Sequence, residues 1–317
     1  MPRILVTGAG GQIGSELVPA LRARYGDENV LATDIREPDG EASEAGPFEV
    51  LDATDADAFA GTAKRFAADT VYHLAAILSA VGEHDPKRAW EVNMGSTVAV
   101  LEVARDRELS VFVPSSIAAF GPDTPRDPAP QDTIQRPTTI YGVTKVSGEL
   151  LCDYYRLRHG VDVRGVRFPG LISWAAPPGG GTTDWAVDIF VHAARGEDYA
   201  CFLPPDARLD MMYMPDALRA AIGVMEADPS RLKHWNAFNV TAMQLAPADL
   251  EPLLAERVPG FRVRYDVDPV RAAIAASWPD RIDDSAAREE WGWAPEWDLE
   301  SMIDDMLTNL RRHTAPV

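Results

Sequence analysis

A glycine-rich segment close to the start of the chain limits the possible folds more than any other feature. Residues Thr7–Gly14 read TGAGGQIG, with Gly8, Gly11 and Gly14 evenly spaced. The apolar run at residues 3–7 precedes this segment, and a helix is predicted directly after it. A unit of strand, glycine turn and helix lets the backbone approach a pyrophosphate at the N-terminus of the helix. The segment therefore predicts a dinucleotide-binding fold.

Short apolar runs alternate with helical stretches throughout the first half of the chain. Strands are expected at residues 3–7, 30–34, 48–52, 70–74, 110–114 and 161–167, and helices at 14–25, 55–66, 86–105 and 139–158. Strands that are apolar on both faces and alternate with helices indicate a parallel sheet built from right-handed βαβ units. The sequence therefore predicts an α/β protein with a Rossmann-type, doubly wound parallel sheet.

The pattern changes after Phe168. A stretch rich in glycine and proline covers residues 169–181 and leads into a helix expected at 183–195. Short strands are expected at 209–214, 237–240 and 262–265, among short helices. We therefore expect residues 1–168 to form an NAD-binding Rossmann domain and residues 169–317 to form mainly a smaller C-terminal substrate-binding lobe. Some elements of this second part, including 237–240, are expected to return to the main sheet.

The charge of the chain argues against several classes of partner. It has 30 basic and 49 acidic residues and a formal net charge of −19, which repels nucleic acid and anionic membrane surfaces. Its two cysteines, Cys152 and Cys201, lie far apart and outside any Cys/His cluster, so we expect no disulfide framework and no metal. No apolar run approaches the ~20 residues of a membrane span, and no signal peptide is recognised. We expect a cytoplasmic protein.

An acidic residue at the end of the second expected strand indicates which dinucleotide is bound. Asp34 follows Gly8 by 26 positions, close to the spacing of the acid that hydrogen-bonds the adenosine ribose. Its carboxylate would repel the 2′-phosphate of NADP, whereas Arg36 would favour that phosphate. We expect the charge of Asp34 to dominate and predict NAD as the cofactor. The alternative is a plain acid at the end of a strand.

The predicted cofactor contacts lie in the glycine turn, at the carboxyl ends of strands, or on the helices beside them. Asp52 ends the third expected strand and could reach the adenine, and small residues after His73 let the backbone pass close to the cofactor. His73 itself is expected to be packed rather than to act as a base. The full set is Gly8, Gly11, Gln12, Ile13, Gly14, Asp34, Arg36, Leu51, Asp52, Leu74, Ala75, Ala76, Asn93, Tyr141, Lys145 and Pro169.

A Tyr-x-x-x-Lys pair supplies the predicted chemistry. Tyr141 and Lys145 are four residues apart on one expected helix, so they lie on one face. Ser116 ends the fifth expected strand, at the sheet edge where ligands bind. A tyrosine with a pKa of ~10 is a weak base at neutral pH, but a nearby ammonium and a positive nicotinamide ring favour its phenolate. We predict Ser116, Tyr141 and Lys145 as catalytic residues; the alternative is that they are ordinary helix-face and strand-end residues.

Several segments together resemble a known group of enzymes. TGAGGQIG, Asp34, SSIAAFG, YGVTK, RFPG and the closing segment Ile282–Leu299 are similar to the extended short-chain dehydrogenases, relatives of UDP-galactose epimerase. Within that group the chain most resembles the short-chain L-threonine 3-dehydrogenases. The segments that carry this likeness are AILSAVGE (76–83), RFPGLIS (167–173), PGGGTTDWAVDIF (178–190) and LDMMYMPDALRA (209–220). One departure is Phe120, where epimerases usually have tyrosine.

The resemblance implies oxidation of L-threonine to 2-amino-3-oxobutyrate, with hydride passing to NAD, tyrosine as the general base, and a homodimer formed through helices 86–105 and 139–158. The implied substrate-binding residues are Ser79, Ser116, Tyr141, Gly181, Thr182, Thr183 and Trp278. The local sequence is compatible with this substrate, because the backbone N–H groups of a helix starting near Thr183 would bind the carboxylate of threonine. An ordinary helix cap explains the same threonines, and Trp278 is either a lid or a packing residue.

Two alternatives stay open at this point. One is a nucleotide-sugar epimerase or dehydratase, which must bind a diphosphate in the second lobe, yet no basic cluster occurs around residues 169–185. The other is a non-catalytic dinucleotide sensor, a class that can dispense with the Tyr–Lys pair that is intact here.

Overall fold

A six-stranded parallel sheet forms the centre of the N-terminal part. The computed structural model describes residues 1–37, 46–175 and 179–314; Pro178, which opens one of the resembling segments, lies outside them. The strand order is β3-β2-β1-β4-β5-β7, all neighbours being parallel. The strands are β1 (Ile4–Thr7), β2 (Val30–Asp34), β3 (Phe48–Val50), β4 (Thr70–His73), β5 (Ser110–Phe112) and β7 (Val163–Arg164). This order is that of the Rossmann fold and confirms the predicted fold class.

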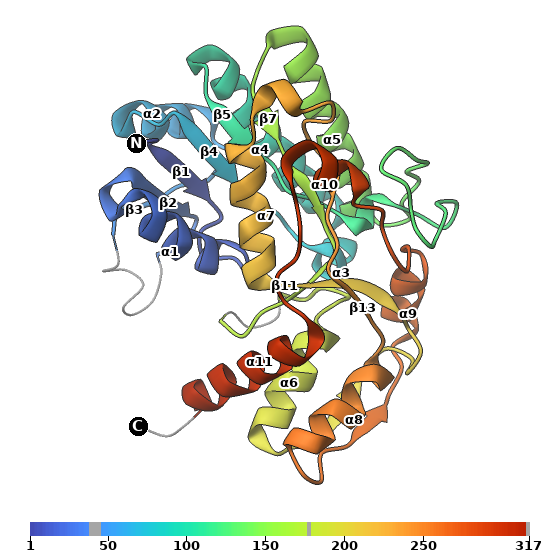
Figure 1. The fold of residues 1–317 in the computed structure, drawn as a ribbon. Helices are drawn as coiled ribbons and strands as arrows, with labels where there is room; N and C mark the ends of the chain where they lie inside the picture. The colour runs from blue at the N-terminus through green and yellow to red at the C-terminus, as the bar shows by residue number, and fades with distance from the viewer. Residues whose placement is uncertain (38–45, 176–178, 315–317) are drawn as a thin grey trace.

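Helices cover both faces of this sheet (Figure 1). They are α1 (Gly14–Tyr25), α2 (Ala56–Phe66), α4 (Pro86–Arg107), α5 (Ile140–His159) and α7 (Met214–Glu226). Side chains alternate along a strand: Leu5 of β1 packs in the core with residues of α2, α4 and α5, whereas its neighbours Ile4 and Val6 pack with α1 and α7. The sheet is therefore buried on both sides, which explains why its strands are apolar throughout.

The ends of α5 agree with the local sequence. The Thr139 hydroxyl accepts a hydrogen bond from the Gly142 N–H at 3.1 Å and caps the first turn. Gly160 ends the helix in the left-handed conformation, with φ of 71°. Tyr141 and Lys145 consequently lie in the first two turns of a firmly bounded helix.

The sixth expected strand, residues 161–167, is broken at Gly165 into β7 and β8 (Val166–Phe168). A Cβ at Gly165 would lie 2.1 Å from the Val113 carbonyl oxygen, so only glycine permits this crossing. β8 pairs with β6 (Ser115–Ser116) and with β12 (Phe238–Asn239) in a separate three-stranded sheet. The segment expected to return to the main sheet thus pairs with the strand beyond the break, not with the six strands themselves.

Most of the remaining elements form a layer below the main sheet in Figure 1. Its strands are β9 (Gly170–Ile172), β11 (Leu209–Tyr213) and β13 (Met243–Leu245) in one sheet, and β10 (Tyr199–Cys201) with β14 (Val263–Tyr265) in another. Its helices are α6 (Trp185–Arg195), α8 (Pro247–Arg257), α9 (Pro269–Ala276) and α11 (Leu299–Thr314). Two further helices lie elsewhere: α3 (Ser79–His84) packs against α4 and α5, and α10 (Ser285–Trp291) packs against β12. The division of the chain at residue 168 stays a prediction.

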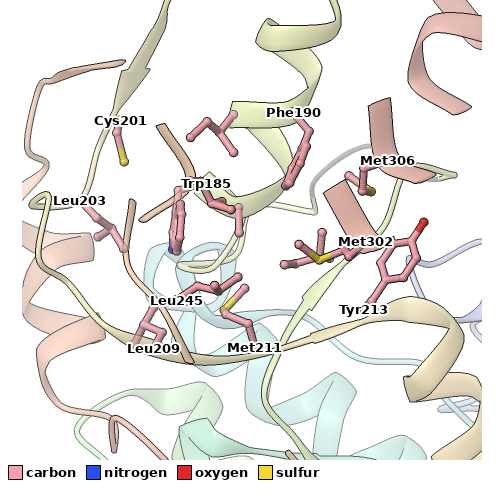
Figure 2. Packing of buried hydrophobic residues seen from close by; sticks show 14 of the residues in the cluster. Trp185, Phe190, Cys201, Leu203, Leu209, Met211, Tyr213, Leu245, Met302 and Met306 are labelled. Carbon is pink, nitrogen blue, oxygen red and sulfur yellow. The ribbon is translucent and has the colours of Figure 1, made fainter. Parts of the chain in front are cut away.

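Apolar side chains between α6, β11 and α11 form the core of this layer. Trp185 and Phe190 of α6 are fully buried and belong to one apolar cluster with Met302 and Met306 of α11 (Figure 2). The expected helix at 183–195 therefore exists, but it begins two residues later, at Trp185. None of the helices within the described residues combines the length and apolarity needed to cross a membrane.

Candidate active site

The glycine turn brings the N-terminus of α1 against the ends of β1 and β4. Gly8 has a φ of 71°, and a Cβ on it would lie 2.7 Å from the Ala75 amide nitrogen. A Cβ on Gly14 would lie 2.4 Å from the Gly8 carbonyl oxygen. Glycine is required at both positions, because the turn is too tight for any side chain. The turn and the first residues of α1, among them Gly11, Gly14 and Ser15, line one pocket. Phosphate binding there stays a prediction.

Asp34 closes β2 beside this turn. Its carboxylate accepts hydrogen bonds from the Gly10 N–H at 3.0 Å and the Arg36 N–H at 3.4 Å. The Arg36 side chain is exposed. Asp34 also lines a pocket with residues predicted to bind the cofactor, namely Gly8, Gly11, Leu51, Asp52, Leu74, Ala75 and Ala76. That this carboxylate holds the ribose of the dinucleotide stays a prediction.

A buried polar atom supports the fit to a cofactor. The Gln12 Nε2 amide is buried and has no hydrogen-bond partner among the described residues. It lies at the glycine turn and lines the same cleft as Ile13 and Pro169, two further predicted contacts. Because buried donors are normally paired, this orphan amide is consistent with a bound polar group such as a phosphate.

Replacing Asp34 with asparagine is expected to relax the preference for NAD. Asparagine keeps an acceptor for the Gly10 N–H but removes the charge that repels a 2′-phosphate. The ratio of kcat/KM for NAD to that for NADP should fall by about tenfold or more, the equivalent of ~1.4 kcal/mol. Asp57→Asn is the matched control, since Asp57 is exposed on α2 and absent from the residues that line the pocket beside Asp34. A wild-type enzyme that uses NADP as well as NAD would contradict this role.

The three predicted catalytic residues meet at the carboxyl ends of β5 and β6. The side chains of Tyr141 and Ser116 are hydrogen-bonded to each other. Lys145 donates from Nζ to the Pro114 carbonyl at 2.7 Å and lies 5.4 Å from the centre of the Tyr141 ring. The strand ends and the first turns of α5 therefore hold a Ser–Tyr–Lys arrangement.

Burial sets the proton affinities of this group. It raises the pKa of Tyr141 to about 12, although the hydrogen bond from Ser116 acts in the opposite direction. It lowers the pKa of Lys145 to about 8, against the nearby charge of Glu149. Tyr141 therefore needs additional positive charge to become a base at neutral pH, and the Lys145 ammonium is the group placed to supply it.

One cleft brings the predicted substrate residues together. It is lined by Ser79, Ser116, Tyr141, Gly181, Thr182, Thr183 and Trp278, and by the predicted cofactor residues Gln12, Ile13, Leu74, Ala76, Lys145 and Pro169. The Thr182 hydroxyl is buried and has no hydrogen-bond partner among the described residues. A polar ligand in this catalytic cleft would satisfy it.

The start of α6 was expected to offer free backbone N–H groups to a substrate carboxylate, and the structure differs in part. Asp184 directly precedes α6, but its side chain makes no capping hydrogen bond to the helix; its carboxylate instead accepts hydrogen bonds from the N–H groups of Gly180 and Gly181, both at 2.7 Å. These two N–H groups are therefore not free to bind a substrate carboxylate. Sequence reasoning missed Asp184, although aspartate directly before a helix is a typical capping residue.

Three other predicted residues have packing partners. Trp278 is 4% exposed and packs in the core of the lower layer while lining the catalytic cleft, so its two proposed roles are compatible. The Asn93 amide bonds the Ile77 backbone and the Thr144 hydroxyl. His73 bonds two hydroxyl side chains, and burial lowers its pKa to about 3, so it is neutral and packed as expected.

A parallel sheet with a glycine turn, an acid at the end of its second strand and a Ser–Tyr–Lys group is typical of dinucleotide-dependent enzymes of the short-chain dehydrogenase type. Residues 4–240 match the model of the NAD dependent epimerase/dehydratase family. The chain belongs to this family, and its cofactor is NAD.

Proteins of known sequence and structure are similar to the chain over its full length. An uncharacterized epimerase/dehydratase of Staphylococcus saprophyticus is 53% identical over 97% of this chain and 96% of its own length. An L-threonine dehydrogenase from Clostridium difficile is 50% identical, with a TM-score of 0.96 over 99% of this chain and 98% of that one. A GalE-like L-threonine dehydrogenase from Cupriavidus necator, in its holo form, is 52% identical, with a TM-score of 0.94 over 98% and 100%.

Proposed function

We propose that the chain is an NAD-dependent L-threonine 3-dehydrogenase that oxidises the 3-hydroxyl of L-threonine to give 2-amino-3-oxobutyrate. The observation that carries this proposal is the catalytic cleft, which is lined both by the Ser–Tyr–Lys group and by Thr182, whose buried hydroxyl has no hydrogen-bond partner among the described residues. Similarity to L-threonine dehydrogenases over nearly the whole chain supports it.

Each catalytic side chain has one task in this reaction. Tyr141 takes the proton of the substrate hydroxyl as a general base. Ser116, hydrogen-bonded to Tyr141, donates to the reacting oxygen and holds it beside the phenol. Lys145 keeps a positive charge near the Tyr141 ring and so favours the phenolate. NAD, when bound, supplies the acceptor for the hydride that leaves C3 of the substrate.

The substrate must be small and polar to fit this site. The cleft is bordered by hydroxyl side chains, Ser79, Thr182 and Thr183, and by the indole of Trp278. Residues 169–185 contain no lysine or arginine, so that stretch offers no cation for the diphosphate of a nucleotide sugar. A compact amino acid is therefore a better match than a nucleotide-sugar substrate.

A direct assay separates these functions. Purified protein is mixed with NAD and L-threonine, and NADH formation is followed by absorbance; parallel samples contain UDP-glucose or UDP-galactose and are analysed for interconversion. Samples with NADP and without substrate are the controls. We expect NADH only with threonine. Interconversion of the UDP-hexoses without any oxidation of threonine would assign the chain to the epimerases, and no turnover with bound NAD would favour a sensor.

We further propose that the protein is a homodimer formed through α4 and α5. These two helices pack side by side, and apolar side chains on their outer faces are 39–79% exposed: Trp90, Val98, Val143, Leu150, Tyr154 and Leu157. Several exposed apolar side chains on one pair of helices are typical of an interaction site. A second copy of the same helix pair would bury it and form a four-helix interface.

A charge placed in this surface is expected to separate the subunits. Leu150→Glu should shift the sedimentation coefficient from that of a dimer to that of a monomer, because a carboxylate cannot be buried unpaired in an apolar interface. Val270→Glu is the matched control, since Val270 on α9 is 63% exposed, the same as Leu150. A monomeric wild type, or a Leu150→Glu variant that stays dimeric, would contradict the proposed interface.

A further inference from the structure

α5 carries a third ionisable side chain in line with Tyr141 and Lys145. Glu149 follows Lys145 by four residues, and residues four apart lie on one face of a helix. The Glu149 side chain is 6% exposed. Within the described residues Lys145 forms no ion pair at 4.0 Å or less, and its Nζ bonds the neutral Pro114 carbonyl. A carboxylate can therefore stabilise the Lys145 ammonium only from beyond 4.0 Å. Glu149, one helical turn further along α5, is placed to exert this charge–charge attraction.

Hydrogen bonds saturate the Glu149 carboxylate. Arg167 of β8 donates from Nε to one oxygen at 2.9 Å and from Nη2 to the other at 2.8 Å. Gln135 donates from Nε2 at 2.7 Å, and the Ser115 hydroxyl donates to the oxygen shared with Arg167 Nε. Hydrogen bonds from a guanidinium to a carboxylate are among the strong ones in proteins. The carboxylate of Glu149 is thus fixed in place by four donors.

The same strand end holds both Glu149 and Lys145. Ser115, which donates to Glu149, directly follows Pro114, which accepts from Lys145. The lysine and the glutamate are therefore tied to two successive residues at the carboxyl end of β5, as well as to each other through one turn of α5. A change in the charge of Glu149 acts on the lysine through this short, rigid frame.

The other titratable groups near Lys145 do not provide this charge. His73, on β4, is neutral because burial lowers its pKa to about 3. Burial raises the pKa of the Cys152 thiol far above its usual value, so it is uncharged. Asp153, on α5 beyond Glu149, bonds Asn236 and faces outward to solvent. Glu149 opposes the effect of burial on the pKa of Lys145.

We propose that Glu149 is a positioning residue for the oxidation. Its carboxylate, fixed by Arg167 and Ser115, keeps Lys145 in the ammonium form and at the Pro114 carbonyl. Glu149 does not line the catalytic cleft, so it acts only through the lysine. This inference rests on the proposed role of Tyr141 as base, which needs the lysine charge.

The test measures the pKa of Lys145 directly by NMR. The chain has only four lysines, so protein labelled with ¹³C-lysine gives few side-chain signals, and Lys145→Arg identifies the signal of Lys145. Glu149→Gln is expected to lower the Lys145 pKa by about one unit or more, the usual effect of losing an opposite charge at close range. Asp153→Asn removes the same charge one turn further along α5 and should leave the value nearly unchanged. An unaltered Lys145 pKa in Glu149→Gln would overturn the proposal.

A second pair of variants covers the risk that Glu149→Gln does not fold, because it leaves Arg167 charged and unpaired. The double variant Glu149→Gln with Arg167→Gln removes both charges of the ion pair. Arg167 also donates from Nη1 to Gln131 and Asn239, on the far side of the carboxylate. We therefore expect the loss of the Glu149 charge to have the larger effect, so that the Lys145 pKa still falls. Glu149→Asp keeps the charge and should restore the pKa. An unchanged pKa in the double variant would also overturn the proposal.

Kinetics separate this inference from the proposed function. In a threonine-active enzyme, Glu149→Gln should move the pH of half-maximal kcat upward, because a lysine that loses its proton earlier lowers the tyrosine pKa less. Since the NMR titration needs no substrate, a wild type inactive on threonine would defeat the proposed function and leave the lysine measurement valid. A wild type that oxidises threonine, but whose Lys145 pKa does not change in Glu149→Gln, would support the proposed function and overturn the inference about Glu149.

Discussion

Replacing Tyr141 with phenylalanine is expected to lower kcat for threonine oxidation by about 10²–10⁴-fold, the usual contribution of a general base. The phenyl ring preserves the packing of the side chain but has no oxygen to take the substrate proton or to bond Ser116. The dissociation constant for NAD should change little, because the glycine turn and Asp34 are untouched. Steady-state kinetics and fluorescence titration with NADH measure the two quantities.

The matched control for this variant is Tyr154→Phe. Tyr154 lies on the same helix, but its side chain is 51% exposed and outside the catalytic cleft. Its kcat should equal that of the wild type. A Tyr141→Phe enzyme with nearly normal kcat would remove Tyr141 from the mechanism, and a large loss in Tyr154→Phe would mean that α5 itself had been disturbed.

Removing the amine and carboxylate from the substrate is expected to have a still larger effect. 2-Butanol keeps the reacting hydroxyl of threonine and lacks both polar groups. A site whose buried polar atoms pair with substrate rejects such an analogue by up to ~10⁴–10⁵-fold in kcat/KM. The Thr182 hydroxyl, buried and without a partner among the described residues, is one such atom. Initial rates of NADH formation with both compounds give the ratio.

L-Serine is the matched comparison for this experiment. It retains both polar groups and lacks only the methyl of threonine, so its kcat/KM should fall by about 10–200-fold, the range for one small apolar group. Comparable rates with 2-butanol and threonine would show that the cleft recognises the hydroxyl alone. Serine rejected more strongly than 2-butanol would place apolar contacts, rather than the hydroxyls lining the cleft, in control of specificity.

Much of the fold was predictable because a sheet covered on both faces requires apolar strands. The expected strand at 30–34 and helix at 14–25 agree with β2 and α1 residue for residue. The break at Gly165 was not predictable, since it depends on the Val113 carbonyl, more than fifty residues earlier in the chain, passing against it. A glycine within an apolar run carries no sign of that approach.

The candidate site was predictable to the extent that strand ends and one helix bring it together. Ser116, Tyr141 and Lys145 converge because parallel strands end at one edge of the sheet. The residues missed were those whose roles depend on three-dimensional partners. The Asp184 carboxylate accepts hydrogen bonds from the N–H groups of Gly180 and Gly181. Glu149 looks like an ordinary acidic residue of a helix in the sequence, and only the structure shows that Arg167 is its ion-pair partner.

The lowered pKa of Lys145 has a consequence for covalent attachment. At about 8, it leaves a substantial share of neutral, nucleophilic amine at pH 8, where an unperturbed lysine is almost entirely protonated. Lys64, Lys87 and Lys233 are exposed and absent from the residues lining the catalytic cleft. A small amine-reactive reagent that enters the cleft at this pH can therefore modify Lys145 as well as the three exposed lysines, which are the ones that a solid support reaches. Coupling at lower pH, or with NAD present to cover the cleft, directs the linkage to the surface.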